Sequence, residues 1–283
     1  MPMSAHKHLC LGLKGFHNMA FVAWTDPAAP AGAVPTICVH GLTRNGRDFD
    51  FLAQRLAFQG PVIAPDIVGR GASDWLRDPM LYALPYYAAD IASLIARLDV
   101  PAVNYIGTSM GGLIGMILAA QPGSPIRRMV INDVGPFVPK AALERIATYV
   151  GKPLRFATIE ALEAHLRLIH APFGPLTDAQ WQHLAAHSHR QVEDGRYAFN
   201  YDPAIVAPMP AALVDSVIWP LYDQITCPTL VIRGADSDLL LPETAQEMTQ
   251  RGPKATIYEV PGCGHAPALM ADDQIAAIAQ FLA

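Results

Sequence analysis

A serine between two glycines, placed where an apolar strand-like run passes into an apolar helix-like run, constrains the fold of this chain most. The run 103–106 leads into Gly107-Thr-Ser-Met-Gly111, and residues 112–120 then have the composition of a buried helix. A strand that turns so abruptly into a helix needs a sharp bend, and the flanking glycines let the backbone pass close to its neighbours. The pattern predicts that Ser109 is held at this bend with its hydroxyl exposed.

Short apolar runs alternate with helical periods along most of the chain. Further strands are predicted at 8–13 and 16–24, which would form a hairpin through Lys14-Gly15, and at 36–39, 62–64, 129–131, 230–232 and 256–260. Helices are predicted at 49–56, 91–98 and 272–282. Runs that are apolar throughout are typical of parallel strands buried on both faces. The sequence therefore predicts an α/β protein with a mostly parallel sheet flanked by helices.

The alternation stops between residue 133 and about residue 219. This interval contains helix-like stretches at 141–149, 159–169 and 178–189 and no convincing strand. We expect residues 1–133 and 220–283 to form one core, with 134–219 inserted as a helical cap. The cap contains His183, His187 and His189, but no HExxH pattern or cysteine pair accompanies them. A solvated helix face is therefore expected there, and no metal site.

Two further strand ends carry groups that could act together with Ser109. His40-Gly41-Leu42 follows the run 36–39, and a backbone N–H from this loop could stabilise an oxyanion together with the amide after the serine. This nominates the amides of Leu42 and Met110, whereas His40 itself is expected to be structural. His265 lies on a glycine-rich loop after the last strand, from which it could reach the serine.

These segments together resemble the motifs of the α/β-hydrolase superfamily. The resemblance is carried by His40-Gly41, the stretch from Pro65 to Asp74, Gly107-Thr-Ser-Met-Gly-Gly112 and Gly262-Cys-Gly-His265. It covers about residues 16–133 and 220–283, and the cap shows no subfamily signature. The resemblance implies an α/β-hydrolase fold whose helical cap is inserted after the strand that follows the nucleophile turn. The Pro65–Asp74 stretch resembles a structural loop, in which Asp66 and Asp74 would hold the backbone.

Three aspartates are candidates for the acid of a Ser-His-Asp triad, and the sequence leaves the choice open. Asp238 follows the run 230–232, where the superfamily usually keeps its acid, and Asp236 lies two residues earlier in the same loop. Asp133 ends the strand after the nucleophile turn, a placement that resembles haloalkane dehalogenases and certain esterases. The spacing to Pro242 favours Asp238 over Asp133, with Asp236 third.

The resemblance and these residues imply a serine hydrolase, a carboxylesterase that cleaves small to medium apolar esters through an acyl-enzyme. Ser109 would attack the ester carbonyl, His265 would take its proton, and the aspartate would orient the imidazole. This chemistry calls for no cofactor and no metal. One alternative is a C–C bond hydrolase of ring-cleavage diketones, which would usually want cationic or polar cap groups to hold a carboxylate. Another is a catalytically silent small-molecule receptor.

Charge and hydropathy exclude other classes of function. The formal net charge is −5 and there is no long basic block, so nucleic-acid binding is not expected. The longest strongly apolar stretch, residues 111–120, is too short to span a bilayer. The first residues lack the apolar segment of a secretory signal, so we expect a cytoplasmic protein acting on a small-molecule ester. The sequence does not indicate an oligomeric state.

Overall fold

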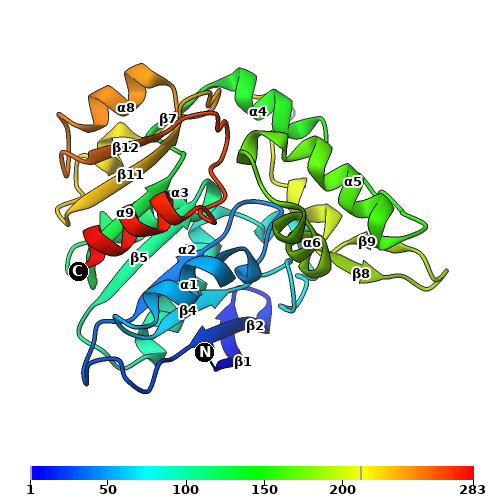
Figure 1. Ribbon diagram of the computed structural model, residues 1–283. Helices are drawn as coiled ribbons and strands as arrows, with labels where there is room; N and C mark the ends of the chain where they lie inside the picture. The colour runs from blue at the N-terminus through cyan, green and yellow to red at the C-terminus, as the bar shows by residue number, and fades with distance from the viewer. Residues whose placement is uncertain (1, 211) are drawn as a thin grey trace.

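A mostly parallel eight-stranded sheet forms the centre of the molecule (Figure 1). The structure is a computed structural model that describes residues 2–210 and 212–283. The sheet order is β1-β2-β4-β3-β5-β6-β11-β12. The strands are β1 (Met3–Gly12), β2 (Gly15–Trp24), β3 (Thr36–Val39), β4 (Val62–Pro65), β5 (Val103–Thr108), β6 (Ile126–Asn132), β11 (Thr229–Gly234) and β12 (Thr256–Val260). All neighbours from β4 to β12 are parallel, as predicted, and the two first strands join antiparallel.

Helices cover both faces of this sheet. One face carries α2 (Leu84–Arg97) and α3 (Met110–Ala119), and the other carries α1 (Asp50–Leu56) and α9 (Asp272–Leu282). In β3, Ile37 and Val39 pack toward α2 and α3, whereas Cys38 packs toward α1 and α9. Successive side chains of a strand point to opposite faces, so a strand with helices on both sides is apolar at every position. A further helix, α8 (Pro242–Met248), connects β11 to β12.

The first two strands form a longer hairpin than the sequence predicts. Their register runs from the pair Met3 and Trp24 to the pair Gly12 and Gly15, so the turn is Leu13-Lys14, one residue earlier than predicted. Gly15 follows this turn with φ 113°, a conformation that favours glycine. β1 lies at the edge of the sheet with most of its side chains exposed. Its early residues therefore show no apolar pattern from which the strand could be predicted.

The inserted segment, residues 134–219, contains the predicted helices and also short strands. Its helices are α4 (Lys140–Ala147), α5 (Ile159–Ile169), α6 (Asp178–His187) and the start of α7 (Trp219–Tyr222). The expectation that it has no strand is wrong. β7 (Phe137–Val138) pairs with β10 (Ser216–Val217), and β8 (His189–Gln191) pairs with β9 (Tyr197–Phe199). Strands of two or three residues are too short to show a period of two. The β7–β10 pair brings the two ends of the segment together, and Figure 1 shows its helices beside the core.

The histidines of α6 face the core and do not form a solvated face, which corrects the expectation from sequence. His183 Nε2 lies 3.0 Å from the carbonyl oxygen of Arg47 and 3.5 Å from Asp50 Oδ2. His187 Nδ1 lies 3.5 Å from the Arg47 guanidinium. Asp50, His183 and His187 are close enough to share a metal ion, but the Asp50 carboxylate already accepts hydrogen bonds from Arg47. These contacts hold α6 against the first turn of α1.

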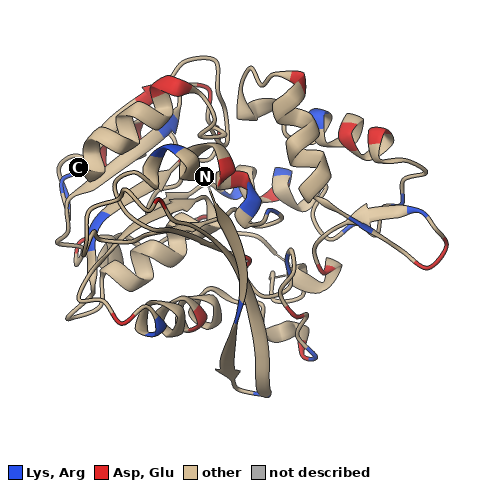
Figure 2. Ribbon diagram, turned by 60° about the horizontal axis from the view of Figure 1, so that its bottom comes forward, with Lys and Arg blue, Asp and Glu red and all other residues tan. Residues whose placement is uncertain are grey.

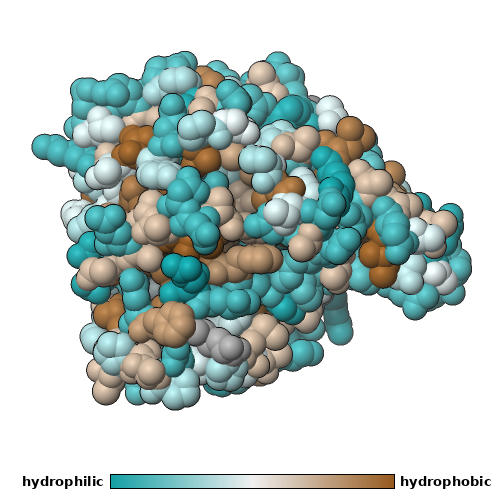
Figure 3. Space-filling view, in the orientation of Figure 1, coloured by the Kyte–Doolittle hydropathy of each residue, from teal (hydrophilic) through white to brown (hydrophobic). Residues whose placement is uncertain are grey.

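Surface charge and hydropathy show no dominant patch in the views drawn. Figure 2 shows Lys and Arg scattered among Asp and Glu over both the core and the inserted segment. On the face drawn in Figure 3, apolar residues occur in small separate groups among hydrophilic ones. Within residues 2–210 and 212–283, no helix combines the length and the apolar character needed to cross a membrane.

Candidate active site

Ser109 occupies a strained turn between β5 and α3. Its backbone has φ 52° and ψ −114°, a conformation that non-glycine residues rarely adopt. The glycines on either side explain how the turn closes. A Cβ atom added to Gly107 would overlap the carbonyl oxygen of Gly111, and one added to Gly111 would overlap the carbonyl oxygen of Val39. Only glycine therefore allows α3 to begin this close to β3, and the serine is left at the apex of the bend.

Ser109, His265 and Asp133 form one continuous hydrogen-bonded chain. Ser109 Oγ lies 2.9 Å from His265 Nε2, and His265 Nδ1 lies 2.8 Å from Asp133 Oδ2. Asp133 is fully buried at the end of β6. Its Oδ1 accepts a hydrogen bond from the Gly234 amide (2.8 Å), and its Oδ2 accepts one from the Ser237 hydroxyl (2.6 Å). Ser237 was not singled out from the sequence, because a loop serine carries no pattern that marks it.

The structure does not place Asp238, the aspartate that the sequence favoured, beside His265. The Asp238 carboxylate accepts hydrogen bonds from Arg145 of α4 at 2.5 and 2.8 Å, and its side chain is 48% exposed. Asp236 makes no side-chain hydrogen bond to any described residue, and its amide donates to the Cys263 carbonyl. β6 and β11 are neighbours in the sheet, so the loops after both strands reach the same place. Of the three candidate aspartates, Asp133 is the one whose carboxylate lies within hydrogen-bond distance of His265.

The two residues whose amides were predicted as oxyanion donors, Leu42 and Met110, lie beside Ser109. A Cβ atom added to Gly41 would lie 3.8 Å from Ser109 Cβ, which places the loop after β3 directly against the serine. Met110 is the first residue of α3, where amides have no acceptor within the helix. Leu42 lies outside the strands and helices, and no backbone carbonyl of a described residue accepts a hydrogen bond from its amide. Both N–H groups can therefore donate to a bound molecule.

His40 is a structural residue, as expected, and it also orients the neighbouring peptide. It is completely buried, its Nδ1 donates to the Gly41 carbonyl (2.7 Å) and its Nε2 accepts from the Ile67 amide (2.9 Å). Burial lowers the pKa of His40 to about 4, so the ring is neutral. The C=O and N–H of a trans peptide point in opposite directions. The hydrogen bond on the Gly41 oxygen therefore helps to hold the Leu42 N–H in its outward direction.

Arg70 is a fully buried cation that the sequence reasoning did not single out. Its guanidinium donates to the carbonyls of Leu42 (2.9 Å) and Val68 (2.8 Å) and to the Tyr87 hydroxyl (2.9 Å). In the part of the chain that the structure describes, no carboxylate forms an ion pair with it, although a buried charge usually has one. The side chain thus holds the Leu42 carbonyl in the loop after β3. The available signal was an arginine inside the glycine-rich stretch 69–71.

The backbone around Arg70 joins the inserted segment. The Gly71 amide donates to the Asn200 carbonyl (2.9 Å), and the Asp202 amide donates to the Gly69 carbonyl (2.8 Å). Arg70 and Tyr201 thereby form an isolated antiparallel bridge. The loop after β4 consequently contacts both the loop after β3 and the insertion.

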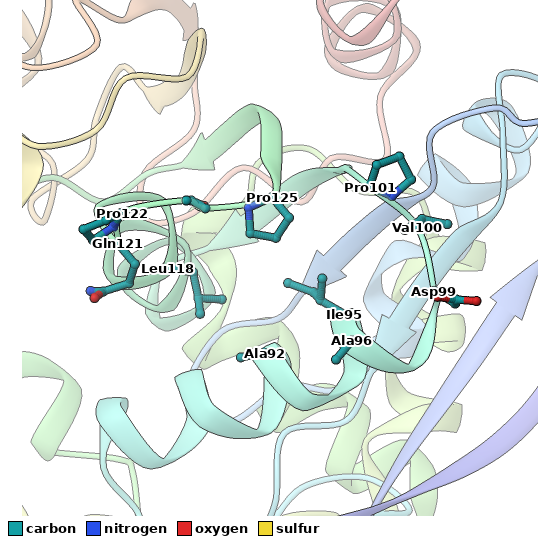
Figure 4. A pocket seen from close by; sticks show the side chains of 12 residues that line it. Ala92, Ile95, Ala96, Asp99, Val100, Pro101, Leu118, Gln121, Pro122 and Pro125 are labelled. Atoms are coloured by element: carbon teal, nitrogen blue, oxygen red, sulfur yellow. The ribbon is translucent and has the colours of Figure 1, made fainter.

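A small cavity of about 70 Å³ opens in front of Ser109. Loops of the core contribute Leu42, Thr43 and Arg44 to its wall, and the inserted segment contributes Tyr149, His170 and Phe173. Arg44 forms an ion pair with Asp48 (2.6 Å) and also donates to Ser188. A larger open groove of about 750 Å³ lies between the ends of α2 and α3, lined by Ile95, Leu118 and Pro122 among others (Figure 4). No residue of the Ser-His-Asp chain lines that groove.

The chain belongs to the alpha/beta hydrolase family, whose model matches residues 36–278. It is therefore a hydrolase with the fold that the sequence motifs implied. It is 46% identical to the 3-hydroxybutyrate-oligomer hydrolase of Cupriavidus necator, over 96% of this chain and 95% of that protein. A solved structure from Rickettsia typhi, described as a hydrolase, superimposes with a TM-score of 0.90 at 32% identity, covering 100% and 99% of the two chains. An alpha/beta hydrolase from Novosphingobium aromaticivorans gives 0.86 at 38% identity, covering 98% of each.

Buried titratable groups around the site predict that the protein loses stability as the pH falls below about 6.5. Burial lowers the pKa of His40 to about 4 and that of His170 well below its usual value, so the unfolded chain binds two protons here that the folded protein does not. Asp66 opposes them, because burial raises its pKa to about 6 and the folded form takes up its proton first. These three groups together leave about one net proton, which corresponds to about 1.4 kcal/mol per pH unit, and the lowered pKa values of His187 and His165 act in the same direction. Urea unfolding midpoints measured from pH 7 to 4.5 should fall accordingly, and a constant midpoint would contradict this assignment.

Proposed function

We propose that this protein is a serine carboxylesterase that cleaves short-chain esters, including oligomers of 3-hydroxybutyrate, through an acyl-enzyme. The observation that carries the proposal is the hydrogen-bonded chain from Ser109 through His265 to Asp133, beside two free amides. The similarity to a 3-hydroxybutyrate-oligomer hydrolase supports the substrate class. In this proposal residues 134–219 act as a cap on a core formed by 1–133 and 220–283.

The geometry supports a two-step acyl transfer to water. Ser109 Oγ attacks the ester carbonyl while His265 Nε2 takes its proton, and the amides of Leu42 and Met110 donate to the oxyanion. Asp133 keeps the second ring proton on Nδ1 and stabilises the imidazolium that forms. The imidazolium then protonates the departing alcohol. A water that loses its proton to His265 then attacks the acyl carbon. The imidazolium returns this proton to Ser109 Oγ as the bond between the acyl carbon and the serine oxygen breaks, which releases the acid.

The size of the cavity supports a short acyl group. The cavity beside Ser109 has a volume of only about 70 Å³, which favours a small acyl group next to the serine. A butyryl or 3-hydroxybutyryl group is small in this sense, whereas a long fatty acyl chain is not. The medium-sized apolar substrates that the sequence suggested would have to extend outside this cavity.

The charges around the cavity favour an ester over a ring-cleavage diketone. A diketone of that class carries a carboxylate, which a C–C hydrolase would usually hold with a cationic group. Arg44 is paired with Asp48 and Arg145 with Asp238, so neither arginine has an unopposed charge to offer. The terminal carboxylate of a 3-hydroxybutyrate oligomer lies at least one unit from the scissile ester and could remain in solvent.

Hydrolysis of p-nitrophenyl esters from acetate to dodecanoate tests the proposed reaction and its chain length. We expect kcat/KM to be highest at two to four carbons and to fall at least about 10-fold by twelve, because longer chains exceed the cavity. The dimer and trimer of 3-hydroxybutyrate should release the monomer. Ser109→Ala protein serves as the blank. A maximum at long chains would contradict the size argument, and folded protein that cleaves no ester would favour the diketone alternative.

A further inference from the structure

His170 is a buried polar side chain on the wall of the cavity in front of Ser109, and its ring forms no hydrogen bond with any residue that the structure describes. It follows the last turn of α5, is 7% exposed, and lines the same cavity as Ser109 and His265. Its ring stacks on Phe173 with centroids 4.4 Å apart and planes inclined by 25°. Neither ring nitrogen of His170 forms a hydrogen bond with a residue within 2–210 or 212–283. Both nitrogens nevertheless keep some contact with solvent. The ring nitrogens of this cavity-lining residue therefore keep some surface that solvent or a bound molecule can reach.

The surroundings of His170 keep its ring neutral. Burial lowers the pKa of His170 well below its usual value, and the positive charge of Arg44 acts in the same direction, as do His265, His165 and Arg145. A neutral imidazole offers one N–H donor and one nitrogen acceptor. A hydroxyl group is its natural complement, because a hydroxyl can also donate and accept.

The other polar side chains of the cavity wall are already engaged, except for the hydroxyls of Thr43 and Tyr149, and Tyr149 is partly buried beside the Arg145 guanidinium. Arg44 donates to Asp48 and Ser188, and the Thr108 hydroxyl accepts from the side-chain amide of Asn132. The Thr43 hydroxyl makes no hydrogen bond to a described residue, but it is only partly buried. An unpaired polar group costs most where it is buried, so His170 gains more than either hydroxyl from a polar atom of a bound substrate.

We propose that His170 is a specificity-determining residue that hydrogen-bonds the oxygen on C3 of a 3-hydroxyacyl ester bound at Ser109. This inference rests on the proposed function and adds the group that distinguishes hydroxyacyl from plain acyl substrates. The acyl unit at the hydroxyl end of a 3-hydroxybutyrate oligomer carries a free C3 hydroxyl, which can both donate and accept, whereas the C3 oxygen of an internal unit is an ester oxygen that can only accept. A plain acyl chain leaves the imidazole unpaired, which lowers the rate of its hydrolysis relative to the hydroxyacyl ester.

A pair of esters that differ by one hydroxyl tests this role. Ethyl 3-hydroxybutyrate, each enantiomer separately, and ethyl butyrate have the same alcohol, and the released acid can be titrated. For the preferred enantiomer we expect wild-type kcat/KM to exceed that for ethyl butyrate. In His170→Phe this ratio should fall by about 3- to 10-fold, the usual effect of one neutral hydrogen bond, while ethyl butyrate is still cleaved. His170→Gln, which keeps a donor and an acceptor, should restore part of the preference.

Two variants serve as matched controls. His165→Phe alters a histidine of the same helix that does not line the cavity and whose Nε2 is buried without a partner, so the ratio should not change. Thr43→Val removes a competing hydroxyl. Because both esters are measured on one preparation, partial loss of folded enzyme cancels in the ratio.

The outcomes separate this inference from the proposed function. A wild-type ratio near one, an unchanged ratio in His170→Phe, or a collapse of the preference in Thr43→Val alone would overturn the role of His170 and leave the esterase intact. Wild-type protein that cleaves neither ester would overturn the proposed function itself, and the role of His170 with it.

Discussion

Replacing Asp133 with asparagine is expected to lower kcat on a short ester by about 10⁴-fold. The Asp133 carboxylate accepts a hydrogen bond from His265 Nδ1 (2.8 Å), and further hydrogen bonds from the Gly234 amide and the Ser237 hydroxyl hold it in place. An asparagine keeps the shape but loses the negative charge that stabilises the imidazolium. Its amide N–H would also favour the wrong tautomer of the histidine. Turnover of p-nitrophenyl butyrate measures the effect, with circular dichroism to show that the variant is folded.

Asp238→Asn is the matched control for this substitution. The chemical change is identical, but Asp238 is half exposed and paired with Arg145, and exposed ion pairs contribute only about 0–1 kcal/mol to stability. We expect its kcat to remain within about 3-fold of wild type. A larger loss in Asp238→Asn than in Asp133→Asn would return Asp238 to the role of the acid.

Ser109→Ala is expected to lower kcat on the order of 10⁶-fold, so that turnover is close to the rate without enzyme. Ser109 is the nucleophile of the proposed mechanism, and an alanine at the same strained turn has no group to attack the ester. The fold should be retained, because the flanking glycines and not the serine hydroxyl allow the turn to close. A sulfonyl fluoride should add one adduct to the wild-type protein, detected by mass spectrometry, and none to the variant.

Cys263 offers a check on this assignment, since it lies two residues before His265. Burial raises the pKa of the Cys263 thiol, and the nearby Asp133 and Asp236 raise it further, so little thiolate forms at neutral pH. Cys263→Ala should therefore keep most of the activity. Substantial turnover in Ser109→Ala that disappears in the double variant would instead identify the thiol as a nucleophile.

The strands of the core and the loops that carry the site could be predicted because their patterns have local physical causes. β3, β12, α5 and α9 begin and end where the sequence indicates. The central strand β3 is apolar on both faces, and each of the two helices has one apolar stripe, so their patterns can be recognised in the sequence. The loops with Leu42, Ser109 and His265 follow three strands whose ends meet at the same edge of the sheet, which is why separate motifs converge on one site.

The sequence could not decide which aspartate contacts His265, because this depends on the direction in which each carboxylate points and not on its position along the chain. Asp133 and Asp238 follow two neighbouring strands, β6 and β11. Asp133 adopts a positive φ of 56°, and its carboxylate is buried against His265, whereas Arg145, a residue 93 positions away, holds Asp238 at the surface. Neither the φ angle of Asp133 nor the ion pair between Asp238 and a distant arginine can be recognised in the local sequence.

The role of Arg70 escaped prediction for a related reason. Its partners are two carbonyls and a tyrosine hydroxyl, and backbone carbonyls have no sequence signature. Short strands such as β8 and β9 were missed because three residues do not define a period.

The bridge between Arg70 and Tyr201 has a mechanical consequence. The backbone on either side of Arg70 hydrogen-bonds to the insertion, and the Arg70 side chain donates to the Leu42 carbonyl. The insertion and the loop after β3 are therefore connected through this one residue. In the proposed mechanism, an ester that is too large for the cavity and pushes the insertion outward would also displace the loop whose Leu42 amide donates to the oxyanion. Oversized esters should therefore be penalised in the speed of the chemical step as well as in the strength of binding.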